Sequence, residues 1–182
     1  MFAASLHIPK DSGKLKEILY STNIYKEVFP MTAKKDQQTT ISPEMAPYLG
    51  GENLIFLATV DATNQTPSIS AISWVKMLDE KTIRISVASS SRILDNIKAN
   101  GRVSLSFIGN ETVYSITGDA SILEEAMEGI AMKLAKIEVK LDQVFNSMFW
   151  GAKITQEPTY EKTYDIEKAK KLDEEVYALL MK

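Results

Sequence analysis

The sequence contains no cysteine, and His7 is its single histidine. Without cysteine, the chain forms no disulfide, thiolate nucleophile or thiolate metal site. One histidine near the N-terminus also excludes a histidine-based catalytic triad or a multi-histidine metal site within one chain. We therefore predict no metal site and assign no catalytic residue. The chemistry that remains is done by carboxylates or supplied by a bound cofactor.

Long apolar runs and an excess of positive charge are also missing. No stretch of about 18 apolar residues is present, so we expect no membrane span. The N-terminus lacks the charged region and apolar run of a secretory signal, which favours a cytoplasmic location. The net charge of −3 and the pI near 5.3 argue against nucleic acid as the main partner.

The sequence does contain strand-like segments separated by short turns. We count about six of them, at residues 53–60, 67–77, 83–87, 103–107, 112–123 and 133–141. One small helix lies between the third and fourth segments. The pattern predicts a mainly β protein, an antiparallel barrel with peripheral helices.

Three parts of the chain are expected. Residues 1–40 form an N-terminal extension of unknown role, with a candidate helix at 12–29. Residues 41–164 form the barrel domain. Residues 165–182 form an amphipathic helix that packs on the barrel, because four apolar residues recur at helical spacing, namely Leu172, Val176, Leu179 and Leu180.

The stretch 83–107 reads as strand, serine-rich turn, short helix and strand. Serines at 89–91 can each cap a helix N-terminus, and Asn100-Gly101 can end the helix because both residues tolerate the left-handed conformation. Free N–H groups at a helix start favour an anion, and Arg92 stands beside them. The turn is therefore a phosphate site or, as is commoner, an ordinary capped helix with a solvated arginine.

Residues 54–107 resemble the FMN-binding split barrel of the pyridoxamine 5'-phosphate oxidase-like family. A looser resemblance, to small bacterial members, extends to Tyr164. The resemblance implies a split-barrel fold, FMN as cofactor, and a homodimer with two FMN molecules at the subunit interface. The matching residues are 57–61, Pro67, 70–76, Ser91, Arg92, Asn96 and 102–105.

The resemblance also implies the cofactor-binding residues. Lys76 matches a lysine at the end of the second family strand, while Ser91 and Arg92 match a turn around the FMN phosphate. Backbone groups of 73–75 could bind the polar edge of the flavin ring. The aromatic cluster at 145–150 is core, a subunit interface or a lid over a flat ligand. From its position after the last predicted strand and before Gly151, rather than from the resemblance, Trp150 is expected near the flavin of the other subunit. The full candidate set is Ser73, Trp74, Val75, Lys76, Ser89, Ser90, Ser91, Arg92, Asn96 and Trp150.

Three positions depart from the family pattern. Ile93 stands where the turn has a lysine, Ala71 where a strand has an arginine, and Val87 where the next strand has a threonine. The oxidase proper also carries a C-terminal segment with tryptophan and arginines that binds the vitamin phosphate. The helix at 165–182 contains no arginine, so we do not expect pyridoxine 5'-phosphate oxidase activity.

These observations leave several functions open. The leading hypothesis is an FMN-dependent oxidoreductase acting on an unknown small molecule. The alternatives are a flavin carrier or sensor without turnover, and a dimeric barrel that has lost its flavin or binds another planar ligand such as haem. Haem is the least expected of these, because the single histidine lies outside the barrel.

Overall fold

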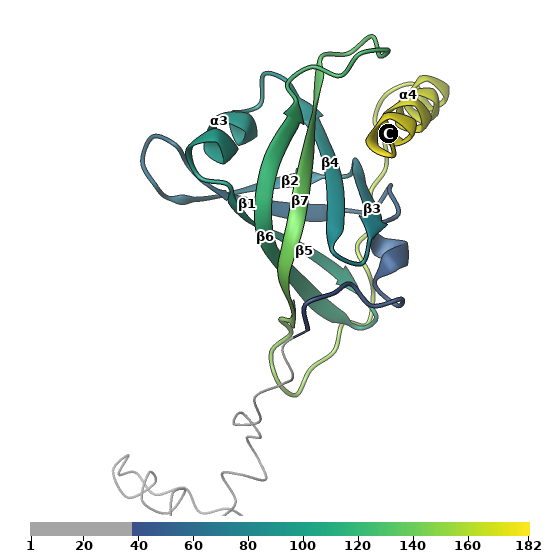
Figure 1. Cartoon of the computed structure of the whole chain (residues 1–182). Helices are drawn as coiled ribbons and strands as arrows, with labels where there is room; N and C mark the ends of the chain where they lie inside the picture. The colour runs from purple at the N-terminus through teal and green to yellow at the C-terminus, as the bar shows by residue number, and fades with distance from the viewer. Residues whose placement is uncertain (1–37) are drawn as a thin grey trace, which may run out of the picture. The chain divides into compact units, whose positions relative to one another are not determined.

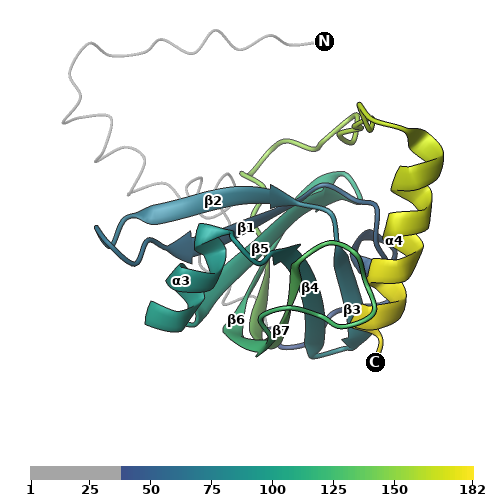
Figure 2. The same ribbon diagram turned by 90° about the horizontal axis from the view of Figure 1, so that it is seen from above.

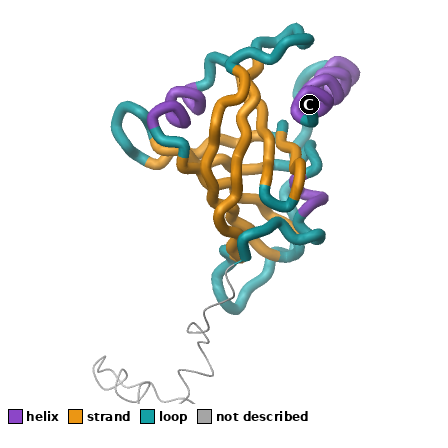
Figure 3. The backbone as a smooth tube through the Cα atoms, viewed as in Figure 1, coloured by secondary structure: helices purple, strands orange, loops and turns teal. Residues whose placement is uncertain are grey.

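The computed structural model describes residues 38–182 (Figure 1). The candidate helix at 12–29, and all but three residues of the expected extension at 1–40, lie outside the described residues. The division of the chain at residues 40 and 164 stays a prediction. Strands dominate the described part and the helices lie at its periphery (Figure 3). The predicted fold class, mainly β with peripheral helices, is confirmed.

Seven strands form one antiparallel sheet in the order β2-β1-β5-β6-β7-β4-β3. In Figure 1, β1 and β2 run across the direction of β4, β6 and β7, so the sheet bends over on itself as a split barrel does. The strands are β1 Ile55–Val60, β2 Pro67–Ile72, β3 Val75–Asp79, β4 Thr82–Ala88, β5 Arg102–Gly109, β6 Thr112–Glu124 and β7 Leu134–Asn146.

The sheet has seven strands rather than six because the predicted strand at 67–77 is two strands. β2 ends at Ile72 and pairs with β1, while β3 begins at Val75 and pairs with β4. Ser73 and Trp74 link them and therefore join the two opposite edges of the sheet. The alternation of apolar residues continues through this link, so the sequence pattern does not reveal the change of pairing partner.

β7 is also longer than predicted and reaches Asn146 instead of Leu141. Its last residues are polar enough to hide the alternation, yet they continue the ladder with β6, where Tyr114 pairs with Asn146. The register between the two strands shifts twice along the ladder. Such irregularities bend and twist long strands, which helps an open sheet to curve.

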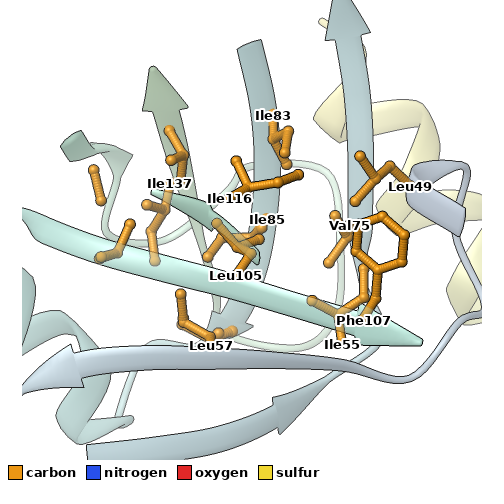
Figure 4. Close-up of a cluster of buried hydrophobic side chains, with 14 of the residues drawn as sticks. Leu49, Ile55, Leu57, Val75, Ile83, Ile85, Leu105, Phe107, Ile116 and Ile137 are labelled. Atoms are coloured by element: carbon orange, nitrogen blue, oxygen red, sulfur yellow. The ribbon is translucent and has the colours of Figure 1, made fainter. Parts of the chain in front are cut away.

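The core fills the space inside the bent sheet (Figure 4). Its largest members include residues from six different strands and from the 3-10 helix η1, Ala46–Leu49. Burial of each such side chain contributes roughly 1.5–3 kcal/mol. The fully buried members include Leu49, Ile55, Leu57, Val75, Ile83, Ile85, Leu105, Phe107, Ile116 and Ile137.

The helix α3, Arg92–Ala99, begins and ends where the sequence predicts. The Ser91 hydroxyl caps it by accepting a hydrogen bond from the Ile93 N–H at 3.3 Å. The reason given for its end was wrong, because Asn100 is extended, with φ −152°, rather than left-handed. Gly101 is required by a close approach: a Cβ there would lie 2.9 Å from the carbonyl oxygen of Ala120.

The helix α4, Ile166–Leu180, is capped by Asp165 and lies beside β3 and β4 (Figure 2). Val176 and Leu180 pack with Met127 and Leu134 in a second apolar cluster. Arg84 of β4 donates to the carbonyl oxygen of Leu180 at 3.0 Å, which satisfies one of the free carbonyls at the helix end. Within residues 38–182, no helix is long and apolar enough to cross a membrane.

Tyr177 of α4 connects the helix to the link between β2 and β3. Its hydroxyl accepts a hydrogen bond from the Glu52 N–H at 2.7 Å and lies 3.3 Å from the carbonyl oxygen of Ser73, to which it donates. Lys76 lies over its ring, with Nζ 4.5 Å from the ring centroid. Burial raises the pKa of Tyr177 to about 12, because a phenolate would lose its hydration there.

We predict that Tyr177 of α4 loses its proton at a higher pH than an ordinary tyrosine. The folded protein holds the Tyr177 proton more tightly than the unfolded chain does, so its contribution to stability is complete below the ordinary pKa of 10.0 and is lost as pH rises towards about 12. The ultraviolet absorbance of phenolate, followed against pH, should therefore lose a late step in Tyr177→Phe. The exposed Tyr164 supplies the control, since Tyr164→Phe should keep that step. Identical late steps in wild type and Tyr177→Phe would contradict the prediction.

Candidate functional site

A cavity of about 550 Å³ lies where the chain passes from β2 to β3. Residues 70–74 form one side, residues 86–88 at the end of β4 form another, and Ser91 and Ile93 close it at the start of α3. Leu54 and Tyr160 complete the lining. The volume is within the range of small-molecule and cofactor sites, roughly 300–1,000 Å³.

The cavity wall is apolar with a few hydroxyl groups, and none of its lining side chains carries a charge. Ser86 is 2% exposed, and its hydroxyl has no hydrogen-bond partner among the described residues. A buried hydroxyl left without a partner destabilises a protein by about 1–3 kcal/mol. A bound ligand with a polar group at this point would provide the missing partner.

Three of the predicted site residues meet in this cavity from separate segments. Ser73 and Trp74 come from the link between β2 and β3, and Ser91 comes from the cap of α3. Val75 follows Trp74 but is fully buried in the core. The Trp74 carbonyl accepts a hydrogen bond from the Ser86 N–H at 3.0 Å, so the link is fastened to β4 beside the cavity.

The remaining predicted residues of the serine-rich turn lie next to the cavity and do not line it. The Ser89 hydroxyl donates to the carbonyl oxygen of Glu125 at 2.6 Å, and Ser90 is exposed. Arg92 is the first residue of α3 and is exposed beside the lining residue Ser91. Of the candidate cations, only Arg92 therefore adjoins the cavity directly along the chain.

Lys76 contacts groups outside the cavity. Its ammonium donates to the carbonyl oxygen of Gly50 and lies over the ring of Tyr177. It is not among the residues that line the cavity. Neither Lys76 nor Arg92 lines this cavity, and the joint action of the two charges on a phosphate stays a prediction.

Asn96 has a structural position in this fold. It is buried in α3, donates to the Thr59 hydroxyl at 2.9 Å and accepts from the Ala62 N–H at 2.9 Å. These bonds fasten α3 to the end of β1 and the following turn. Both ends of the amide are occupied, and Asn96 does not line the cavity.

Trp150 follows β7 and is 60% exposed. It does not line the cavity of the same chain. Its expected position near the flavin of a second subunit stays a prediction.

All three positions that depart from the family pattern line the cavity. Ala71, Val87 and Ile93 present apolar side chains where the pattern has an arginine, a threonine and a lysine. The departures therefore make three sides of the cavity more apolar than the family pattern, and the strands and helix that carry them are all formed.

The sequence did not identify two residues at this site, one aromatic and one acidic. Tyr160 lines the cavity, and Asp173 of α4 accepts a hydrogen bond from the indole Nε1 of Trp74 at 2.8 Å. The only signal for Asp173 is its spacing, because it falls on the apolar stripe of the helix. Nothing in the sequence pattern marks Tyr160.

A second, more polar cavity of about 600 Å³ adjoins the first. The two share Leu54 and Tyr160 in their walls. Its other lining residues come from 52–53, 158–162 and the first turns of α4. Tyr160 consequently lies between an apolar cavity and a charged one.

Comparisons with known proteins place the chain. A model of the pyridoxamine 5'-phosphate oxidase family matches residues 41–146, more than half of the 182 residues. A candidate pyridoxamine 5'-phosphate oxidase from Lactobacillus delbrueckii has a similar structure, with a TM-score of 0.53 at 19% identity, over 62% of this chain and 99% of that one. A comparison with curated proteins finds no match.

HupZ of Group A Streptococcus is similar as well. Its TM-score is 0.51 at 23% identity, over 62% of this chain and 98% of that one. At such identities the structural likeness establishes a common fold. Together with the family model, it shows that the chain belongs to the pyridoxamine 5'-phosphate oxidase-like split-barrel family.

Proposed function

We propose that the protein binds FMN in the cavity between the β2–β3 link and the start of α3, and that it is a flavin-dependent oxidoreductase for a small molecule. The observation that carries the proposal is the convergence of Ser73, Trp74 and Ser91 on one cavity of cofactor size. These are residues that the family pattern relates to the flavin, and they come from two segments separated by β3 and β4.

The residues present fit the ring of a flavin. The cavity offers apolar surface from Ile72 and Val87, aromatic surface from Trp74, and an unpartnered hydroxyl on Ser86. A flavin ring is planar and mostly apolar, with polar atoms along one edge. Bound there, the flavin would supply the hydride chemistry, so the absence of cysteine and of a histidine triad is no obstacle.

The phosphate would be held at the start of α3. Ser91 and Arg92 would supply a hydroxyl and a positive charge, and the N-terminal N–H groups of the helix favour an anion. Lys76 is engaged with Gly50 and Tyr177 and is given no role in this arrangement.

A flavin carrier or sensor without turnover is the second candidate. It is favoured by the apolar residues Ala71, Val87 and Ile93, which remove three polar contacts from the cavity wall. A cofactor-free barrel and haem binding are further outcomes of the same test. The described residues contain no histidine to bind haem iron, since the single histidine is His7.

The visible spectrum of the purified protein tests the proposal. We expect two flavin bands, in the blue and the near ultraviolet, and release of FMN from the denatured protein. Bleaching of these bands by a reduced nicotinamide, followed by recovery in air, would support an oxidoreductase, whereas a spectrum that does not bleach would favour a carrier. A protein that stays colourless and binds no added FMN would overturn the proposal.

Arg92→Ala should separate phosphate recognition from ring recognition. A hydrogen bond to a charged group is worth roughly 1.5–3 kcal/mol, so FMN affinity should fall by one to two orders of magnitude. Riboflavin has no phosphate and should lose far less. The matched control is Lys98→Ala, which removes a cation from the other end of the same helix and should leave the ratio of FMN to riboflavin affinity unchanged. Equal losses for both ligands in Arg92→Ala would show that the arginine does not read phosphate.

We also propose that the protein is a homodimer. The segment 145–150 exposes several large apolar side chains, among them Phe149 at 72% and Trp150 at 60%. Exposed apolar patches commonly mark interfaces. Light scattering should give about twice the chain mass of 20.3 kDa, and Phe149→Glu should shift the protein towards monomer. The same change at the exposed Ile69, which lies in β2, serves as the control. A monomer at all concentrations would refute the dimer and the role of Trp150 at a partner's flavin.

A further inference from the structure

Asp173 is a charged residue on the buried face of α4. It is 3% exposed, and it shares that face with three apolar residues, namely Ala169, Val176 and Leu180. A buried carboxylate without partners destabilises a protein strongly, because it loses its hydration. Asp173 therefore requires the groups that bind it.

The two oxygens of Asp173 bind groups from two sides of the cavity. The indole Nε1 of Trp74 donates to Oδ1 at 2.8 Å, and the ammonium of Lys162 forms an ion pair with Oδ2. Trp74 lines the cavity. Lys162 belongs to the segment 158–162, which we call the strap, and the strap also carries the lining residue Tyr160.

One carboxylate is thus connected to both aromatic side chains of the described cavity wall. It holds Trp74 directly and Tyr160 through Lys162, whose Cα lies at most about 7 Å along the chain from that of Tyr160. The side chain of Lys162 is 24% exposed, so the ion pair is largely shielded from water. If the strap detached from α4, Asp173 would keep its buried charge without the neutralising ammonium of Lys162. The energetic cost of that unpaired charge keeps the strap docked.

We propose that Asp173 is a positioning residue that sets the spacing of Trp74 and Tyr160 across the cavity, and so determines how well a planar ring is held. This inference rests on the proposed function. Asp173 itself touches no cofactor in this scheme and acts through the two aromatic side chains.

Asp173→Asn separates the two connections. The asparagine keeps an oxygen that can accept from the Trp74 indole, but it removes the charge that holds Lys162. Asp173→Leu removes both. Glu174→Gln is the matched control, because it makes the same loss of charge at the exposed neighbouring residue of the same helix.

Three measurements test the inference: the rate of tryptic cleavage, the affinity for riboflavin and FMN, and the emission of Trp74. In Asp173→Asn, tryptic cleavage after Lys162 should become several times faster, and riboflavin and FMN should each bind about three- to tenfold more weakly, since one aromatic contact is lost. In a Trp150→Phe background, where Trp74 is the single tryptophan, its emission should stay unchanged in Asp173→Asn and shift in Asp173→Leu. Glu174→Gln should change none of these.

Lys162→Met breaks the Asp173–Lys162 ion pair by removing the ammonium instead of the carboxylate. It is tested beside Asp173→Asn if Asp173→Leu does not fold. The double variant Asp173→Asn/Lys162→Met should bind riboflavin no more weakly than Asp173→Asn alone. Wild-type cleavage and riboflavin affinity in Asp173→Asn would overturn the inference. If the wild type binds neither FMN nor riboflavin, the proposed function fails, while the cleavage and emission measurements still decide whether Asp173 positions the strap and Trp74.

Discussion

The change of pairing partner at Ser73 and Trp74 is the constraint on which the rest of the structure depends. The chain leaves one edge of the sheet and enters the other within two residues, because β2 pairs with β1 while β3 pairs with β4. The two edges are therefore joined at this point, and the sheet has to bend to bring them together. The cavity lies at the junction. Edge strands also carry backbone groups that no neighbouring strand uses, which suits such a place to ligand binding.

The helix α4 makes this junction stable by covering it. Its contacts with the link are polar and specific: Tyr177 binds at Ser73 and Glu52, and Asp173 binds the indole of Trp74. The Asp173 carboxylate, which is 3% exposed, differs from the surface ion pairs of the protein, such as Lys153–Glu111, whose partners are both 63% exposed. Exposed pairs contribute little to stability because water screens them, whereas a buried carboxylate requires its partners.

The distribution of charge around the cavity limits the chemistry that it supports. The wall carries hydroxyls and aromatic rings but no charged side chain, so the ring of a ligand is recognised mainly by shape and burial. An anionic group on that ligand would have to lie at the start of α3, beside Arg92. The adjoining cavity is charged, and Tyr160 separates the two. An apolar space and a charged one are thus neighbours in this fold.

The sequence alone determined the succession β4, α3 and β5, including the cap at Ser91, because alternation and capping act between residues only a few positions apart. It also determined the fold class, the family and three of the residues that line the cavity. Only the tertiary structure decided that residues 67–77 form two strands, that Lys76 binds Gly50 and Tyr177, and that Asn96 binds Thr59. Trp74 and Asp173 are 99 positions apart. Such contacts depend on which strands pair and where the last helix docks, and packing of the whole chain settles both, so local sequence patterns carry no signal for them.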